Sequence, residues 1–267
     1  MLRSGGGAVG DLISLERDGG IGQISLHRPP ANAYNGQFMR ELDEAVEAVR
    51  ADDGVRVAVV TSTLPRFFCA GADVKMFQAS SLREKEKFIL RMHEVLRTIE
   101  LTPKVFIAAI NGHCLGGGME IALACDLRFA AAGTYGLGQP EVILGILPGN
   151  GGTQRLPRLV GKSRALDLMI TGRTVSPEQA LTLGLVDRVV PAEELLPSVR
   201  AYAEPLTRSA AVAVGLIKLA VTRGMELPLD GGLAYEREAL FRAFATEDAG
   251  EGVNAFLEKR SPAFKGK

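Results

Sequence analysis

The feature that most constrains the fold is an alternation of β-branched runs with amphipathic helical patterns over the first 140 residues. Two apolar runs, "LISLE" and "IGQISLH", flank the turn sequence "RDGG" and predict a hairpin. The segment "GQFMRELDEAVEAVR" then places apolar side chains at helical spacing, and the strand-like run "VRVAVVTS" follows it. Strands that alternate with helices in this way predict an α/β core.

The same alternation continues and then changes to helices. A helical pattern in "REKEKFILRMHEVLRTIELTPK" ends at Pro103, and "VFIAAI", "DLRFAAAG" and "TYGLG" read as strands. Beyond about residue 140 helical segments dominate, and one of them begins with a capping box at Ser176. No repeat or low-complexity linker interrupts the chain. We therefore predict an α/β core over residues 1–200 and a helical C-terminal extension over residues 201–267.

The charge balance argues against two classes of partner. Lys and Arg total 31, Asp and Glu total 31, and the hydrophobic fraction is 46%. A chain without net charge has no electrostatic excess to hold a nucleic acid or an anionic membrane. A small molecule bound by local contacts is the better expectation.

The cysteines and the apolar segments indicate a compartment. Cys69, Cys114 and Cys125 are odd in number and lie in apolar segments, which predicts buried thiols in a reducing environment rather than a metal site. The N-terminal "MLRSGGGAVG" lacks the apolar core of a signal peptide, and the longest apolar region, from Val105 onward, is interrupted by Glu120. The sequence therefore predicts a cytoplasmic protein with no membrane span.

The segment "NGHCLGGGMEIALAC" places a carboxylate, Glu120, at the head of an apolar run. Desolvating a carboxylate is costly unless it is paired or hydrogen-bonded. A turn through residues 112–115 and a helix that starts near residues 116–118 would expose N–H groups at a helix N-terminus, where an oxyanion can bind beside Glu120. The alternative is structural: the glycines permit tight packing, and Glu120 satisfies the helix N-terminus.

Two further segments offer partners for this site. In "FFCAGADVKMF", Ala70-Gly71-Ala72 follows a strand and can expose a second backbone N–H, although a simple loop fits it as well. In "GQPEVILGILPGNGGTQRL", Glu141 follows a proline; such a residue is usually an exposed helix start, but beside Glu120 it becomes a candidate acid or base. No G-x-S-x-G, H-E-x-x-H or G-x-G-x-x-G pattern supports a hydrolase, zinc or nicotinamide site.

In their order and spacing, "FCAGADVKMF", "NGHCLGGGMEIALACDLRFAA" and "GQPEVILGILPGNGGTQRL" resemble the crotonase (enoyl-CoA hydratase/isomerase) superfamily. The match runs from "LHRPPANAYN" to "KRSPAFKGK". The resemblance implies a crotonase-like spiral of β-β-α units with a C-terminal helical trimerisation region. It implies a hydro-lyase of fatty acid β-oxidation that converts trans-2-enoyl-CoA into 3-hydroxyacyl-CoA. It further implies a homotrimer or dimer of trimers and no cofactor, since coenzyme A is part of the substrate.

The resemblance also assigns roles by position. The N–H groups of Ala72 and Gly117 would hold the thioester oxygen, Glu120 and Glu141 would flank the reacting carbons, and Gly149 would help to position water. Two carboxylates that share one proton would supply an ionised base, Glu120, and a protonated acid, Glu141. The residues implied to bind coenzyme A, the last two of them in a neighbouring subunit, are Ala70, Ala72, Asp73, Val74, Lys75, Gly117, Phe264 and Lys267.

The chain departs from the family pattern at two places. "RPPANAYN" is shorter than the common form and has Tyr34 where an aliphatic residue is usual, which bears on the coenzyme A contacts and the acyl pocket. One extra residue lies between Glu120 and Glu141, which bears on their relative placement. A Δ3,Δ2-enoyl-CoA isomerase, which needs one shuttling carboxylate, or another acyl-CoA reaction of the superfamily is the alternative; an RNA-binding homologue is disfavoured by the neutral charge.

Overall fold

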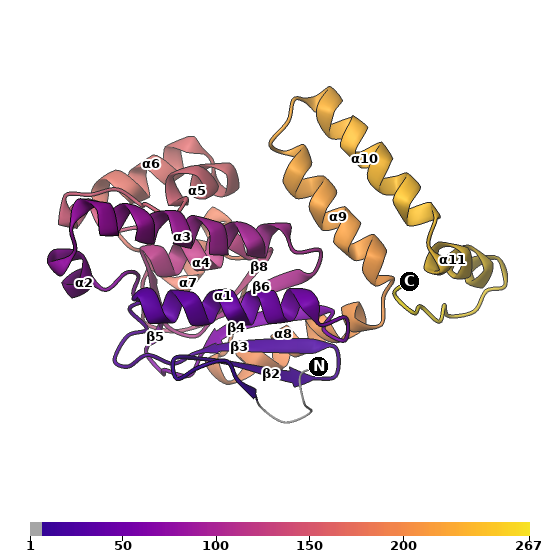
Figure 1. Cartoon of the computed structure of the whole chain (residues 1–267), viewed down its shortest axis with the longest axis horizontal. Coiled ribbons are helices and arrows are strands. Elements are labelled where there is room, and N and C mark those ends of the chain that lie inside the picture. The colour runs from indigo at the N-terminus through magenta and orange to yellow at the C-terminus, as the bar shows by residue number, and fades with distance from the viewer. Residues whose placement is uncertain (1–6) are drawn as a thin grey trace.

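A computed structural model of the chain describes residues 7–267. The first six residues, which belong to the segment inspected above for a targeting signal, lie outside the described residues. A seven-stranded sheet forms the centre, in the order β1-β2-β3-β4-β6-β8-β10 (Figure 1). Its strands are β1 (Gly7–Ala8), β2 (Ile13–Asp18), β3 (Ile21–Leu26), β4 (Val57–Ser62), β6 (Val105–Ile110), β8 (Leu127–Ala131) and β10 (Arg188–Val190).

The sheet confirms the predicted α/β core. β2 and β3 pair antiparallel as the expected hairpin, and from β3 onward every pair in the sheet is parallel. All six residues of β4 are buried, as the β-branched run "VAVVTS" predicts for a strand that is covered on both faces. β10 is an edge strand, and the sequence did not predict it.

A second, three-stranded parallel sheet, in the order β5-β7-β9, consists of β5 (Phe67–Cys69), β7 (His113–Leu115) and β9 (Leu137–Gly138). The expected turn through residues 112–115 is therefore wrong, because His113–Leu115 pairs with both neighbouring strands. Each short strand follows a strand of the large sheet: β5 follows β4, β7 follows β6, and β9 follows β8. This repetition is the predicted spiral of β-β-α units.

Helices cover both faces of the large sheet. On one face lie α1 (Gly36–Ala51), α3 (Leu82–Leu101) and α4 (Gly117–Ala124), and on the other lies α8 (Leu195–Thr207). α1 and α3 match their predicted patterns, and the capping box at Ser176 is present at α7. The remaining elements of this part are α2 (Val74–Ala79), the 3₁₀ helix η1 (Glu141–Leu144), α5 (Gly152–Val160), α6 (Lys162–Thr171), α7 (Pro177–Leu183) and the 3₁₀ helix η2 (Ala192–Glu194).

The last three helices, α9 (Ala211–Gly224), α10 (Leu229–Phe244) and α11 (Glu247–Leu257), extend away from the sheets (Figure 1). α9 is anchored by Lys218, whose Nζ donates to two backbone carbonyls at 2.8 Å and pairs with Asp126 at 2.9 Å. The predicted division at residue 200 falls within α8, which packs on the sheet, and the division itself stays a prediction.

Large apolar side chains on these helices are exposed. Those exposed by more than half include Ile217, Val221, Met225, Leu229, Leu240, Phe241, Phe244, Val253, Phe256 and Leu257. Within residues 7–267 no single helix is long and apolar enough to cross a membrane, although the stretches 192–207 and 211–224 together reach that length and composition across a bend of 111°.

Candidate active site

A cleft of about 320 Å³ lies where four elements meet: the turn after β5, the N-terminus of α4, the segment around η1, and α3. Its walls are mostly apolar, and two carboxylates open into it. The lining includes Tyr34, Ala70, Gly71, Ala72, Val74, Phe77, Ile89, Gly116, Gly117, Glu120, Glu141, Gly149 and Asn150. The three predicted segments therefore meet at one place.

The turns of the first two segments are in direct contact. A Cβ added at Gly71 would lie 3.1 Å from the backbone nitrogen of Gly117, and Gly71 has a φ of +94°, which favours glycine. Gly117 is the first residue of α4, where backbone N–H groups have no partner within the helix. Neither its N–H nor that of Ala72 donates to any acceptor within residues 7–267. Two free donors thus lie on adjoining turns that line the cleft.

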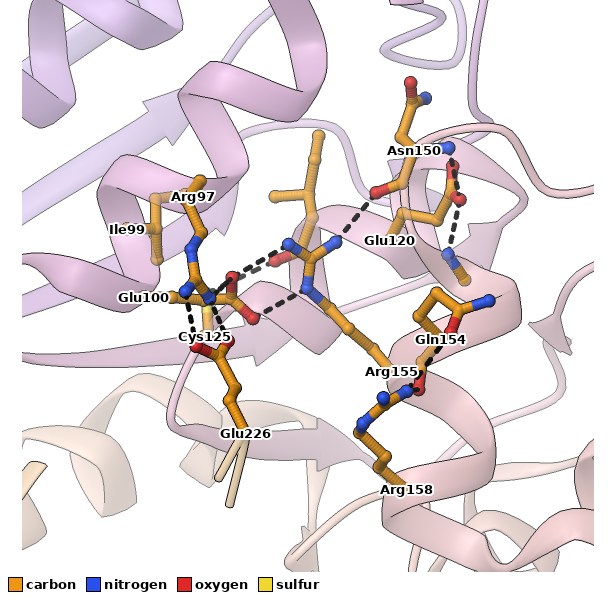
Figure 2. Close-up of polar contacts among 12 residues, drawn as sticks. Arg97, Ile99, Glu100, Glu120, Cys125, Asn150, Gln154, Arg155, Arg158 and Glu226 are labelled. Atoms are coloured by element: carbon orange, nitrogen blue, oxygen red, sulfur yellow. Dashed lines mark hydrogen bonds and ion pairs between the residues drawn. The ribbon is translucent and has the colours of Figure 1, made fainter. Parts of the chain in front are cut away.

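Glu120 lies in the first turn of α4 and is 1% exposed. Its Oε1 accepts from the backbone N–H groups of Asn150 at 2.7 Å and Gly152 at 2.8 Å (Figure 2). It therefore does not cap its own helix, as the structural alternative required, but is held by the loop that precedes α5. Burial raises the pKa of Glu120, and the two N–H bonds oppose that rise.

Glu141 begins η1 and approaches Gly116 at the head of α4. A Cβ added at Gly116 would lie 3.1 Å from Oε1 of Glu141, and Oε2 is buried without a partner in the described chain. Burial raises the pKa of Glu141 to about 7, and the charge of Glu120 adds to the rise. Both carboxylates therefore open into the same cleft, and the charge on one bears on the protonation of the other.

The loop that holds Glu120 is itself held by residues that the sequence did not indicate. Arg155 donates to the carbonyl of Asn150 at 2.7 Å and forms a two-pronged pair with Glu100 at 2.7 and 2.9 Å. Figure 2 shows the continuous path from Glu100 through Arg155 and Asn150 to Glu120. In addition, the His93 ring bonds the carbonyl of Gly149 at 2.6 Å. Arg155 lies within one helical turn after the loop, so its position in the sequence was a local signal of its role. Glu100 and His93 lie in α3, and no feature of the sequence around them signals that they contact the loop.

The glycines have physical reasons beyond ligand approach. A Cβ at Gly117 would lie 1.8 Å from the hydroxyl oxygen of Tyr34, and one at Gly118 would lie 2.1 Å from the carbonyl of Cys69. The structural alternative, tight packing, thus accounts for Gly118. At Gly117 the side chain of Tyr34 occupies the space that a Cβ would need.

The other predicted residues are only partly in the cleft. Ala70 and Val74 line it, whereas Asp73 caps α2 and pairs with Arg28 at 2.8 Å, and Lys75 is absent from the lining. The C-terminal residues lie elsewhere, against α11. Phe264 packs at Gly252 of that helix, and the carbonyl of Lys267 accepts from the N–H of Asp248 at 3.2 Å. Figure 1 places α11 and α2 at opposite ends of the molecule.

The three cysteines are buried and free, as predicted. Across the described part of the chain no group of His, Cys, Asp and Glu residues is arranged to hold a metal ion.

Comparison with known proteins identifies relatives along nearly the whole chain. The family model for enoyl-CoA hydratase/isomerase matches residues 16–267. The short-chain-enoyl-CoA hydratase of Clostridium acetobutylicum is 41% identical over 93% of this chain and 95% of its own, and the crotonyl-CoA hydratase of Syntrophomonas wolfei is 42% identical over 94% and 97%. A crystal structure of an enoyl-CoA hydratase from Geobacillus kaustophilus superposes with a TM-score of 0.95 at 45% identity, covering 97% of this chain and 98% of that one.

The first prediction concerns the support of Glu120. Arg155→Met removes both the donor to the Asn150 carbonyl and a positive charge that lowers the pKa of the carboxylate, so the pKa of Glu120 should rise. Infrared titration of the carboxyl bands, assigned with Glu120→Gln, measures the change. Arg158→Met is the matched control, because Arg158 lies on the same helix and bonds only Gln154 (Figure 2). An unchanged Glu120 titration in Arg155→Met would contradict the prediction.

Proposed function

The chain belongs to the enoyl-CoA hydratase/isomerase family, and on this basis we propose that it hydrates trans-2-enoyl-CoA thioesters to 3-hydroxyacyl-CoA. The observation that carries the proposal is the pair of carboxylates, Glu120 and Glu141, in the cleft that also contains two free N–H groups. The names of two relatives, a short-chain-enoyl-CoA hydratase and a crotonyl-CoA hydratase, support a short acyl group as the substrate.

The free N–H groups of Ala72 and Gly117 supply an oxyanion hole. When both donate to the thioester oxygen, C3 becomes electrophilic and the enolate formed by addition of water is stabilised. Loss of one such donor typically costs about 2.7–4 kcal/mol of transition-state stabilisation. The fixed backbone of the two adjoining turns keeps the donors in place before substrate binds, so little reorganisation accompanies the reaction.

The carboxylates divide the proton transfers. Glu120, whose ionised form is favoured by the N–H bonds of Asn150 and Gly152, takes a proton from the water that attacks C3. Glu141, whose pKa of about 7 keeps much of it protonated near neutral pH, delivers a proton to C2. Gly149 is the first residue of the loop that holds Glu120. We propose that Gly149 helps to position the attacking water through the shape of that loop.

Isomerisation between 3-enoyl and 2-enoyl thioesters is the second candidate. One observation favours it: Glu141 combines the raised pKa with an unpartnered oxygen, and a single carboxyl group of that kind can both remove and return a proton. The loop contacts of Glu120 favour hydration, because they hold a second carboxylate at the same cleft.

The assembly and the coenzyme A contacts are part of the proposal. The exposed apolar side chains of α9, α10 and α11 would be buried in a homotrimer or a dimer of trimers. Phe264 and Lys267 lie away from the cleft of their own chain, so they would contact the coenzyme A bound to a neighbour. Backbone groups of Ala70, Asp73, Val74 and Lys75 would bind the coenzyme A part of the substrate. The buried free cysteines support a cytoplasmic location, and no further cofactor enters the mechanism.

The decisive experiment follows the oxygen. Incubation of trans-2-crotonyl-CoA with the protein in ¹⁸O-water should give a product with one labelled oxygen at C3, because Glu120 activates water. Glu120→Gln and Glu141→Gln should each lower kcat by about 10²-fold or more, and the double variant should lose less than the product of the two effects. Interconversion of 3-enoyl and 2-enoyl thioesters without label would reverse the choice in favour of isomerisation.

The pH dependence follows from Glu141. Its pKa is raised to about 7, and the acid is active when protonated, so kcat/KM should fall as the pH rises through about 7. Glu141→Gln cannot lose that proton, and its residual activity should lack the decline. Glu193→Gln, at an exposed position in η2, is the control and should keep the wild-type profile. A wild-type profile that stays flat from pH 6 to 9 would rule out Glu141 as the acid.

The assembly is tested by sedimentation equilibrium, which should give three or six chains at micromolar concentration because the exposed apolar face needs a partner.

Deletion of residues 264–267 should raise KM before it changes kcat, since the tail is assigned to coenzyme A binding. A well-folded monomer that turns over crotonyl-CoA with an unchanged KM would show that the tail has no such role.

A further inference from the structure

Tyr34 is a buried polar side chain in the cleft that the mechanism above does not use. It is 1% exposed, yet it contributes to the lining of the cleft. Its hydroxyl group is a hydrogen-bond donor as well as an acceptor, and a buried donor without an acceptor costs about 1–3 kcal/mol. A bound ligand that accepts a hydrogen bond from this hydroxyl would remove that cost.

The backbone of Tyr34 is fixed to the turn that carries Ala72. The N–H of Tyr34 donates to the carbonyl of Gly71 at 2.8 Å, and the carbonyl of Tyr34 accepts from the N–H of Asp73 at 2.9 Å. These two bonds bracket Ala72 and leave its N–H free. Tyr34 therefore has a constant position relative to the first oxyanion donor.

The ring of Tyr34 is fixed as well. It stacks on Phe88 with a centroid separation of 5.9 Å and an interplanar angle of 10°, and it packs against Phe38 at 6.1 Å. A ring between two aromatic neighbours has little freedom to swing away from the cleft. Its hydroxyl group is accordingly held at one place.

That place adjoins the second oxyanion donor. The hydroxyl oxygen lies 1.8 Å from the position of a Cβ on Gly117, so it contacts the α-carbon of the residue whose N–H is free. Nδ2 of Asn150 donates to this oxygen at 2.6 Å, Oδ1 of the same amide is buried without a partner, and no other group within residues 7–267 hydrogen-bonds the hydroxyl. Burial, with the charge of Glu120, raises the pKa of Tyr34 well above its ordinary value, so the proton is retained.

We propose that the hydroxyl of Tyr34 is a third donor of the oxyanion hole, which hydrogen-bonds the thioester oxygen beside the N–H groups of Ala72 and Gly117. This inference rests on the proposed function. An oxygen bound by the N–H of Gly117 lies next to the hydroxyl group, whereas the attacking water lies at the carboxylates. The bond from Asn150 polarises the hydroxyl and strengthens its donation as negative charge develops. No proton is transferred, and Tyr34 stays neutral throughout.

The test is Tyr34→Phe, which keeps the ring and its stacking and removes only the hydroxyl group. We expect kcat for crotonyl-CoA to fall by about 10²-fold, with little change in KM. Tyr135→Phe is the matched control, because that half-buried hydroxyl donates to the carbonyls of Ala131 and Ile110 outside the cleft. It should leave kcat unchanged.

A spectroscopic measurement separates polarisation of the substrate from a structural effect. With crotonyl-CoA labelled with ¹³C at the thioester carbonyl and bound to the slow Glu141→Gln variant, the carbonyl stretch reports the donors on its oxygen. Adding Tyr34→Phe should move that band to higher wavenumber, and adding Tyr135→Phe should not. Tyr34→Leu, which removes the hydroxyl with different packing, is the second variant and should shift the band in the same direction.

The outcomes are distinct. Unchanged kcat in Tyr34→Phe, or a lower kcat with an unmoved carbonyl band, overturns the inference, since the hydroxyl would then not touch the thioester oxygen. Failure of the proposed function would appear differently: the wild-type protein would not turn over crotonyl-CoA, while the band of the bound thioester would still show whether Tyr34 contacts it.

Discussion

The structure of the site depends on the burial of one carboxylate. Glu120 is surrounded by apolar groups, and it is stable there because the loop before α5 turns two backbone N–H groups toward it. That loop keeps its shape because Arg155 holds the carbonyl of Asn150 and His93 holds the carbonyl of Gly149. Groups on α3, α4 and α5 thus act together to compensate for the desolvation of a single charge. The same contacts shape the mouth of the cleft.

Local signals predicted the regular elements well. β-branched runs, helical spacing and capping residues identified the hairpin, β4, β6, α1, α3 and α7, because each of these is specified by neighbours in the chain. The resemblance to a family brought together the segments around Ala72, Glu120 and Glu141, which the cleft unites. The short strand His113–Leu115 was missed because three residues carry little pattern.

Apart from Arg155, which follows the loop within one helical turn, the supports of the site had no local signature. Arg155 meets Glu100 across 55 residues, and Tyr34 meets Asn150 across 116. Nothing near Glu100 or His93 distinguishes them from other polar residues of an amphipathic helix, since both complete a contact that exists only after α3 and α5 pack together. The residues proposed to act on the substrate lie in the motifs that carry the family resemblance, whereas those that hold them in place depend on the three-dimensional arrangement.

The close fit between Tyr34 and Gly117 limits how this protein can change during evolution. Any side chain at position 117 would collide with the hydroxyl at 1.8 Å, and removing only the hydroxyl leaves ring carbons at 2.6 Å. A substitution at position 117 is therefore accessible only after the ring at position 34 has been replaced by something smaller. The two positions are epistatic with a fixed order of mutation, and a lineage that acquired the tyrosine has made the glycine at position 117 harder to lose.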